Sequence, residues 1–287
     1  MGMKKLKCVF ASIALLLIFN SGCKKGTVQP VVPLKSEDFI NVSYGANARN
    51  KLDLYLPAER NKNTPVILLV HGGSWFEGDK SMFTDLAKYW RDKGYAAATM
   101  NYRLTRTAEN NIHPAQVNDI SKAIEFIGSK ANNWQISPDK FALQGASAGA
   151  HLSLLYTYKF NTDDKVKAVI SLAGPTDLTV VQFLSPSQAQ IIQGLIGSTI
   201  QTNPAAYAQA SPVTHISAAS KPTLIFHGKL DVVVPYQQSA ELTARLKQLG
   251  AIGKLVLYED TGHEVLNLNH TVSFLADSES WFKLYLK

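Results

Sequence analysis

The chain has 287 residues, of which 46% are hydrophobic and 18% are charged. This is the composition of a globular protein, long enough for one large α/β domain or two small ones, and it contains no internal repeat and no long low-complexity segment. The formal net charge is +7, but the basic residues are scattered and form no run interleaved with aromatic residues. A nucleic-acid-binding surface is therefore not expected.

The amino-terminal 22 residues are typical of a secretory signal peptide. Three lysines precede an apolar core over residues 9–19, which is too short to span a bilayer comfortably. Small residues then precede Cys23, as in the lipobox of bacterial lipoproteins, whose cysteine is acylated and becomes the new amino terminus. Asn20 stands where that box usually has Leu. The alternatives are cleavage without lipidation and a plain apolar tail.

These features predict a lipid-anchored protein of the bacterial cell envelope, periplasmic or on the outer membrane, and otherwise a secreted one. Residues 1–22 would be the lipoprotein signal peptide, residues 23–36 a tether, and residues 37–287 the folded domain. The two cysteines, Cys8 and Cys23, both precede that domain. No disulfide and no thiolate metal site is therefore expected in it.

Apolar runs indicate strands, and apolar residues at helical spacing indicate helices. Strands are expected at residues 39–44, 52–56, 66–70, 95–100, 141–143, 166–172, 223–226 and 254–258. Helices are expected at residues 83–93, 114–129, 151–156, 188–195, 239–249 and 270–286. The first two strands are predicted to be antiparallel. The later alternation of strands and helices predicts an α/β fold, with a mostly parallel sheet of about eight strands and helices on both faces.

An insertion over residues 175–220 breaks this alternation. It is rich in Gln, Ala, Ser and Thr and contains several prolines. Over the carboxyl ends of the strands it would form a small lid. The alternative is a packed excursion with no role in binding.

The segment Gly-Ala-Ser-Ala-Gly, residues 145–149, lies between a predicted strand and a predicted helix. Gly-x-Ser-x-Gly in that context is the signature of a nucleophile elbow. Gly145 and Gly149 would lie against the neighbouring strand and helix, where a Cβ atom would clash. Ser147 would take a strained backbone conformation and expose its hydroxyl group. The alternative is an ordinary turn rich in Gly and Ala.

A serine nucleophile needs a base and a carboxylate that orients the base, in the chain order Ser, acid, His. Of the seven histidines, His263 follows a predicted strand by a short loop near the end of the chain, where the base is expected. Asp231 follows the strand at residues 223–226 and is the predicted acid, with Asp177 as the alternative. His71 and His227 each follow a strand and precede a glycine, so they are expected to bond their own turns.

Backbone N–H groups must also stabilise the charge that develops in the transition state. One is expected from Ala148, directly after the nucleophile. The others are expected from the glycine-rich turn His-Gly-Gly-Ser-Trp that begins at His71. Gly72 and Gly73 would allow close approach of the substrate, and Gly73 and Ser74 are the expected donors. A simple turn is the alternative.

Trp75 and Phe76 follow this turn and are candidate substrate-binding residues, because they could form an aromatic wall beside the reacting group. The alternative is that both side chains belong to the hydrophobic core.

Taken together, HGGSWFEGDK, NYRL, GASAGAH, SPVT, HGKLD and TGH resemble the esterase branch of the α/β hydrolases. They are most similar to the carboxylesterase and feruloyl- or acetyl-xylan-esterase-like group, which is related to the hormone-sensitive-lipase family. The resemblance covers residues 38–287. Ser74 departs from it, since many members have a third glycine there. The residues after His263 depart as well, where many members have a further Gly or Phe.

The resemblance implies a serine esterase that forms an acyl-enzyme intermediate and needs no metal or cofactor. Its substrate would be a small-molecule or oligosaccharide ester, such as an acetyl or feruloyl ester of a plant-type carbohydrate. HGGxW is also similar to kynurenine formamidases, so an arylformamidase or a peptidase-like amide hydrolase is the second hypothesis. A non-catalytic binding protein with the same fold is the third.

Overall fold

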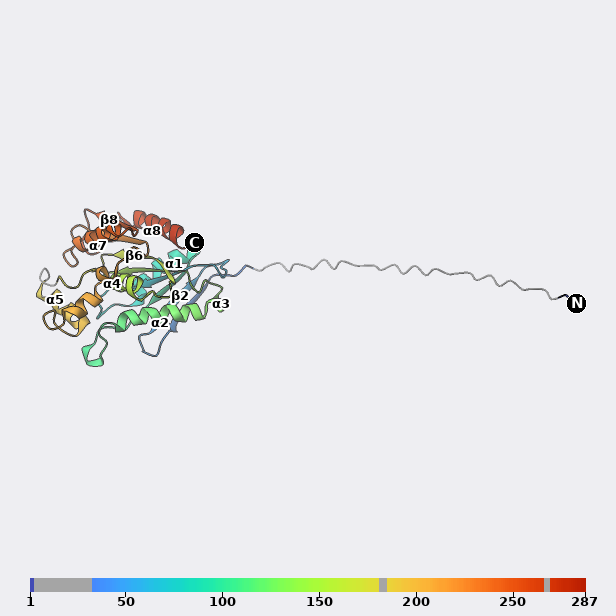
Figure 1. Ribbon diagram of the computed structural model, residues 1–287, viewed down its shortest axis with the longest axis horizontal. Helices are drawn as coiled ribbons and strands as arrows, with labels where there is room; N and C mark the ends of the chain where they lie inside the picture. Colours follow the sequence, from blue (N-terminus) through green and yellow to red (C-terminus); the bar gives the residue numbers. More distant parts are fainter. Residues whose placement is uncertain (3–32, 181–184, 266–268) are drawn as a thin grey trace. The chain divides into compact units, whose positions relative to one another are not determined.

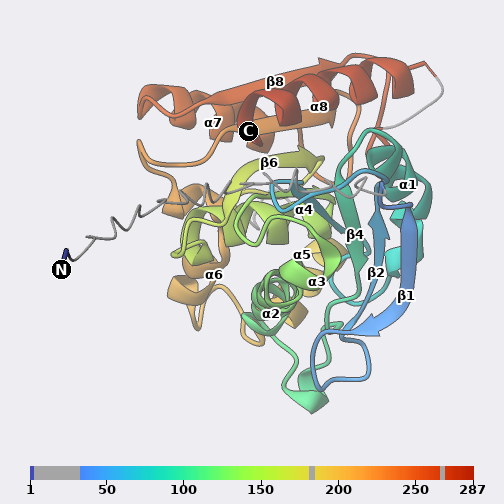
Figure 2. The same cartoon turned by 90° about the vertical axis from the view of Figure 1, so that its right-hand side faces the viewer.

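Eight strands in the described part of the chain form one sheet, in the order β1-β2-β4-β3-β5-β6-β7-β8. The strands are β1 (Glu37–Ser43), β2 (Lys51–Leu56), β3 (Val66–Val70), β4 (Ala96–Met100), β5 (Phe141–Ala146), β6 (Val166–Leu172), β7 (Thr223–Gly228) and β8 (Gly253–Tyr258). β2 is antiparallel to β1 and to β4, and all other neighbours are parallel. Figure 2 shows β1 and β8 at opposite edges. The predicted α/β fold with a mostly parallel sheet is confirmed.

The computed structural model describes residues 1–2, 33–180, 185–265 and 269–287. The residues from Pro33 to Lys287 form one compact unit (Figure 1). Nearly all of the predicted signal peptide, Cys23 and most of the predicted tether lie outside the described residues. Within the ranges described, no helix has the length and apolar character needed to cross a bilayer.

Helices cover both faces of the sheet, as predicted. They are α1 (Thr84–Asp92), α2 (Ala115–Ser129), α3 (Ala131–Trp134), α4 (Ala148–Leu155), α5 (Pro186–Ile196), α6 (Pro204–Ala210), α7 (Gln237–Gln248) and α8 (Thr271–Tyr285). Alternate side chains of β3 enter two separate cores: Val66, Leu68 and Val70 pack with α2, α4 and α7, whereas Ile67 and Leu69 pack with α1 and α8. Because both faces are covered, β3 is apolar along its whole length.

The segment around Ser147 differs from the sequence prediction at its boundaries. β5 continues past residue 143 to Ala146, because Gly145 still pairs with Val70 of β3 and with Ser171 of β6. α4 begins directly at Ala148 rather than at residue 151. Residues 144–150 are mostly Gly, Ala and Ser and show no apolar pattern. The sequence therefore indicated a longer connection between the strand and the helix. The serine is therefore the single residue between strand and helix.

The insertion between β6 and β7 contains the short helix α5, close to the predicted range, and also α6, which was not predicted. α5 begins with a capping box: the hydroxyl of Ser185 accepts the Gln188 N–H, and the Gln188 side chain accepts the Ser185 N–H. Ile192 and Leu195 of α5 are buried in the same core as α2 and α4. The insertion is thus packed onto the domain along part of its length.

Candidate active site

Ser147 occupies a sharp turn between β5 and α4, with φ 51° and ψ −120°. Such a conformation is costly for a residue other than glycine, on the order of 1–3 kcal/mol, and persists only where its surroundings impose it. A Cβ atom at Gly149 would overlap the carbonyl oxygens of Val70 and His71, and one at Gly145 would overlap the backbone of Gly149. The two glycines therefore allow the close packing that holds the strained serine in place.

The side chains of Ser147, His263 and Asp231 form a hydrogen-bonded chain. His263 Nε2 lies 2.9 Å from Ser147 Oγ, and His263 Nδ1 lies 2.8 Å from Asp231 Oδ2. Since a carboxylate only accepts, Nδ1 carries the hydrogen and Nε2 accepts from the serine hydroxyl. The alternative acid, Asp177, lies elsewhere and accepts hydrogen bonds from the N–H and hydroxyl of Thr179. The structure thus brings together the three residues predicted as nucleophile, base and acid.

Asp231 has all of its accepting positions occupied. Oδ1 accepts the N–H groups of Val233 and Val234, each at 2.8 Å. Oδ2 lies 2.8 Å from His263 Nδ1 and 3.1 Å from His227 Nε2. Burial raises the pKa of Asp231, but the hydrogen bonds from His227, His263 and Val234 outweigh it and hold the pKa well below its usual value. The acid is therefore ionised and fixed in orientation.

His227 does bond its own turn, as expected from its place before a glycine, since its Nε2 lies 2.9 Å from the carbonyl oxygen of Val234. Its second contact, to the carboxylate of Asp231, was not predicted. Both residues belong to the segment HGKLD, four positions apart. The four-residue spacing was the only sequence signal for a contact between His227 and Asp231. The two side chains meet because the chain reverses direction directly after β7.

The glycine-rich turn after β3 lies against Ser147. A Cβ atom at Gly72 would stand 3.1 Å from the carbonyl oxygen of Ala146 and 3.4 Å from Ser147 Cβ. Gly73 and Ser74 both have positive φ, 105° and 49°. The carbonyl oxygen of Gly73 accepts the N–H groups three and four residues later, at Phe76 (3.1 Å) and Glu77 (3.0 Å).

Three backbone N–H groups belong to residues that line cavities together with Ser147. Those of Gly73, Ser74 and Ala148 donate to no group within the described residues. Ser74 and Ala148 line a cavity together with Ser147, and Gly73 lines a second cavity together with Ser147. A carbonyl oxygen placed next to Ser147 can accept hydrogen bonds from this region.

Side chains that the motifs HGGSWFEGDK and NYRL supply hold this turn in place. Lys80 Nζ forms a buried ion pair with Asp53 Oδ2 at 2.7 Å. Asn101 accepts the Lys80 N–H at 2.6 Å and donates to Asp79 Oδ2 at 2.7 Å. Burial raises the pKa of Asp79, but the hydrogen bonds from Asn101 and Ser81 lower it to about 2. The segment that follows the turn is therefore tied to β2 by an ion pair, and to the residue directly after β4 by hydrogen bonds.

Trp75 is both a core residue and part of a cavity wall. It is 4% exposed, and its indole N–H donates to His151 Nδ1 at 3.1 Å. His151 Nε2 donates in turn to the carbonyl oxygen of Ala210 at 2.8 Å, and burial lowers the pKa of His151 to about 3. Phe76 is 42% exposed and lines a groove with α5 that does not include Ser147.

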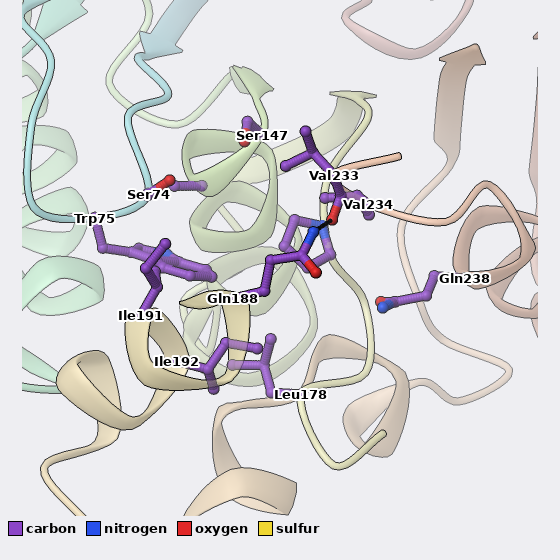
Figure 3. Close-up of a pocket in the computed structure, with 12 residues that line it drawn as sticks. Ser74, Trp75, Ser147, Leu178, Gln188, Ile191, Ile192, Val233, Val234 and Gln238 are labelled. Carbon is purple, nitrogen blue, oxygen red and sulfur yellow. Dashed lines mark hydrogen bonds between the residues drawn. The ribbon is translucent and has the colours of Figure 1, made fainter. Parts of the chain in front are cut away.

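A small cavity lies on the Trp75 side of Ser147. Its volume is about 60 Å³. Figure 3 shows α5 placing Ile191 and Ile192 toward it, with Trp75 on one side and Val233 and Val234 on the other. Gln188 closes it further, because its amide donates to the carbonyl oxygens of Val232 (3.2 Å) and Val233 (2.9 Å). Its walls are Ser74, Trp75, Ser147, Ala148, Pro175, Leu178, Gln188, Ile191, Ile192, Val233, Val234 and Gln238.

A larger and more open cavity lies on the His263 side of Ser147. Its volume is about 410 Å³, and Glu77 and Glu264 bring two exposed carboxylates to it. His263 lines this cavity but not the small one. Among residues 33–180, 185–265 and 269–287, no group of three or more His, Cys, Asp and Glu side chains is arranged to hold a metal ion.

The chain is similar to esterases in sequence and in fold. It is 29% identical over 225 residues to the probable carboxylic ester hydrolase LipM of Mycobacterium tuberculosis. The aligned region covers 73% of this chain and 52% of LipM. The chain thus spans about half the length of the curated relatives it matches. A truncated carbohydrate esterase from gut microbiota superposes with a TM-score of 0.75 at 25% identity, over 86% of this chain and 95% of that one.

A bifunctional GH43-CE protein of Bacteroides eggerthii superposes with a TM-score of 0.74 at 24% identity, over 85% of this chain and 38% of that one, and supports the fold alone. The model of the BD-FAE family matches residues 52–246, a segment that runs from β2 to α7 and includes Ser147 and Asp231. Because that segment is well over half of the 287 residues, the chain belongs to the BD-FAE family and has the α/β-hydrolase fold.

Proposed function

We propose that the protein is a carboxylic ester hydrolase that forms an acyl-enzyme on Ser147. The observation that carries the proposal is the hydrogen-bonded chain from Ser147 through His263 to the buried carboxylate of Asp231, at 2.9 Å and 2.8 Å. A serine hydroxyl in that environment can lose its proton to the imidazole as it attacks a carbonyl carbon. The similarity to LipM supports the same reaction.

In the first half of the reaction, Ser147 Oγ bonds to the acyl carbon and its proton passes to His263 Nε2. The oxyanion accepts hydrogen bonds from Ala148 N–H and from the glycine-rich turn, where Gly73 and Ser74 are the proposed donors and Gly72 allows the close approach. His263 then protonates the leaving alkoxide as the ester C–O bond breaks. In the second half, water attacks the acyl-enzyme, with His263 again as base, and releases the acid. The scheme uses no metal or cofactor.

The position of His263 assigns the two cavities. The same Nε2 that takes the serine proton must deliver it to the leaving oxygen, so the alcohol lies on the side of His263, in the cavity of about 410 Å³. The acyl substituent then occupies the small cavity of about 60 Å³ beside Trp75. That is less than half of the roughly 150 Å³ that accommodates a benzene ring. This volume favours an acetyl group over a feruloyl ring.

The alcohol is proposed to be a sugar. The larger cavity has room for a sugar ring, and the carboxylates of Glu77 and Glu264 in its wall can accept hydrogen bonds from hydroxyl groups. The similarity to a carbohydrate esterase from gut microbiota supports the same class of substrate. Of the two acyl groups that the sequence suggested, the cavities favour acetyl, and the substrate is proposed to be an acetylated sugar or oligosaccharide.

A substrate panel tests the proposal. The purified domain should hydrolyse p-nitrophenyl acetate and acetylated xylo-oligosaccharides, and feruloylated xylo-oligosaccharides much more slowly. Ser147→Ala should abolish turnover and labelling by a fluorophosphonate. Wild-type activity in Ser147→Ala would contradict the proposed nucleophile. Faster turnover of formyl-kynurenine or dipeptidyl amides than of esters would favour the amide-hydrolase alternative instead.

We also propose that the enzyme is attached to the bacterial cell envelope through lipid on Cys23. The support is the sequence of residues 1–23, with a basic start, a short apolar core and small residues before the cysteine. Cells that express the full chain should incorporate labelled palmitate into it. Cys23→Ser should abolish the label and release activity into the soluble fraction, whereas the matched variant Cys8→Ser should retain it. Equal labelling of both variants would argue against the anchor.

A further inference from the structure

We infer that His227 is a positioning residue for the proposed ester hydrolysis, acting on the base through the carboxylate that it shares with His263. The inference rests on the proposed function, in which Asp231 orients His263. It adds a second imidazole to the hydrogen-bonded chain, on the side of Asp231 away from Ser147.

The contacts of His227 define its tautomer. Nε2 faces two oxygens, Asp231 Oδ2 at 3.1 Å and the Val234 carbonyl at 2.9 Å, and neither can donate. Nε2 therefore carries a hydrogen and shares it between them. Nδ1 lies 2.7 Å from Ser239 Oγ in α7, a hydroxyl that can donate to this nitrogen when it carries no hydrogen. His227 therefore links Ser239 to Asp231.

Burial makes these contacts exclusive. His227 and Ser239 are 0% exposed, and the carboxylate of Asp231 is likewise inaccessible. Water cannot replace a donor that is lost at this place, so a carboxylate oxygen deprived of His227 stays unpaired or turns away to find another partner. Asp231 has four accepting positions, and the two histidines and the N–H groups of Val233 and Val234 occupy them.

Two effects on His263 follow. His227 prevents rotation of the Asp231 carboxylate. The other lone pair of Oδ2 therefore stays directed at His263 Nδ1. It also withdraws negative charge from the oxygen that His263 uses, which reduces the stabilisation of the imidazolium relative to a carboxylate with one histidine partner. The other titratable side chains that line the cavity of His263 are Glu77 and Glu264, and both are exposed to solvent.

The test compares two substitutions at one position. His227→Leu removes the donor, and His227→Gln keeps an amide N–H near the place of Nε2. We expect His227→Leu to lower kcat by about 10- to 100-fold with little change in KM, as for loss of a buried hydrogen bond to a charged group. The acid limb of its kcat/KM profile should move to higher pH, because the imidazolium is then stabilised more. His227→Gln should recover most of kcat and restore the limb.

A double-mutant cycle separates positioning from folding. If His227 acts through Asp231, adding His227→Leu to Asp231→Asn should lower kcat no more than about twofold beyond Asp231→Asn alone. The melting temperatures of all variants give the folded fraction. The inference is overturned if His227→Leu keeps the wild-type kcat and the wild-type acid limb of the pH profile. It is also overturned if His227→Leu and His227→Gln lower activity only in proportion to the loss of folded protein. Additive effects of His227→Leu and Asp231→Asn on kcat would overturn it as well.

Failure of this inference is distinct from failure of the proposed function. If Ser147→Ala abolishes ester hydrolysis while His227→Leu has no effect, the esterase stands and the positioning role falls. If Ser147→Ala remains active, the esterase proposal itself falls.

Discussion

The two cavities that meet at Ser147 differ in how the chain builds them. The small cavity beside Trp75 is walled mainly by apolar side chains from distant segments, including α5 and the loop after β7, and Gln188 ties those two segments together. The larger cavity beside His263 is bounded by the glycine-rich turn and the histidine loop, and its walls combine apolar side chains such as Phe83 and Leu172 with the carboxylates of Glu77 and Glu264. From this difference we expect the small side of the serine to select the acyl group by volume, and the larger side to accept bulkier alcohols.

The largest expected effect comes from the carboxylate behind both cavities. Asp231→Asn should lower kcat/KM for p-nitrophenyl acetate by about 10⁴-fold near neutral pH, because an amide no longer fixes the tautomer of His263. Asp177→Asn is the matched control, since Asp177 bonds Thr179 and should be near wild type. Steady-state kinetics on both variants decides, and a larger loss in Asp177→Asn would reverse the assignment of the acid.

The next effect concerns the turn that borders both cavities. Lys80→Met removes one partner of the buried pair with Asp53 and leaves the carboxylate uncompensated. Such a change typically destabilises a protein by about 3–5 kcal/mol. Urea unfolding should show this loss. The exposed pair of Lys229 with Glu259 offers a control, and Lys229→Met should leave the unfolding free energy close to that of the wild type. Equal losses in the two variants would contradict the anchoring role.

The smallest effect sharpens the comparison of volumes. Ile192→Ala shortens a wall of the small cavity, so the ratio of p-nitrophenyl butyrate to acetate turnover should rise about tenfold, in line with one or two methylene groups accommodated in an apolar pocket. Leu195→Ala is matched, because Leu195 is buried in the same helix but does not line the cavity. If Leu195→Ala shifts acyl preference as much as Ile192→Ala, the small cavity does not hold the acyl group.

Local rules explain why much of the fold could be predicted. The sheet strands are apolar runs with both faces covered, so their positions were evident for β3 and β6 to the residue. Boundaries were wrong where the residues are small, as at the end of β5 and the start of α4. The helix α6 was missed because a seven-residue stretch rich in alanine has no distinct apolar face.

The sequence by itself determined the chain order of Ser147, Asp231 and His263, and the glycines at the turns beside them. Those features follow from backbone sterics and from loops placed after strands, which are local properties. Only the tertiary structure decided that Asp231 rather than Asp177 reaches His263, that His227 shares the same carboxylate, and that α5 leaves about 60 Å³ beside Ser147. Each of these depends on side chains from separate segments meeting at atomic distance, and no pattern along a single chain encodes that separation.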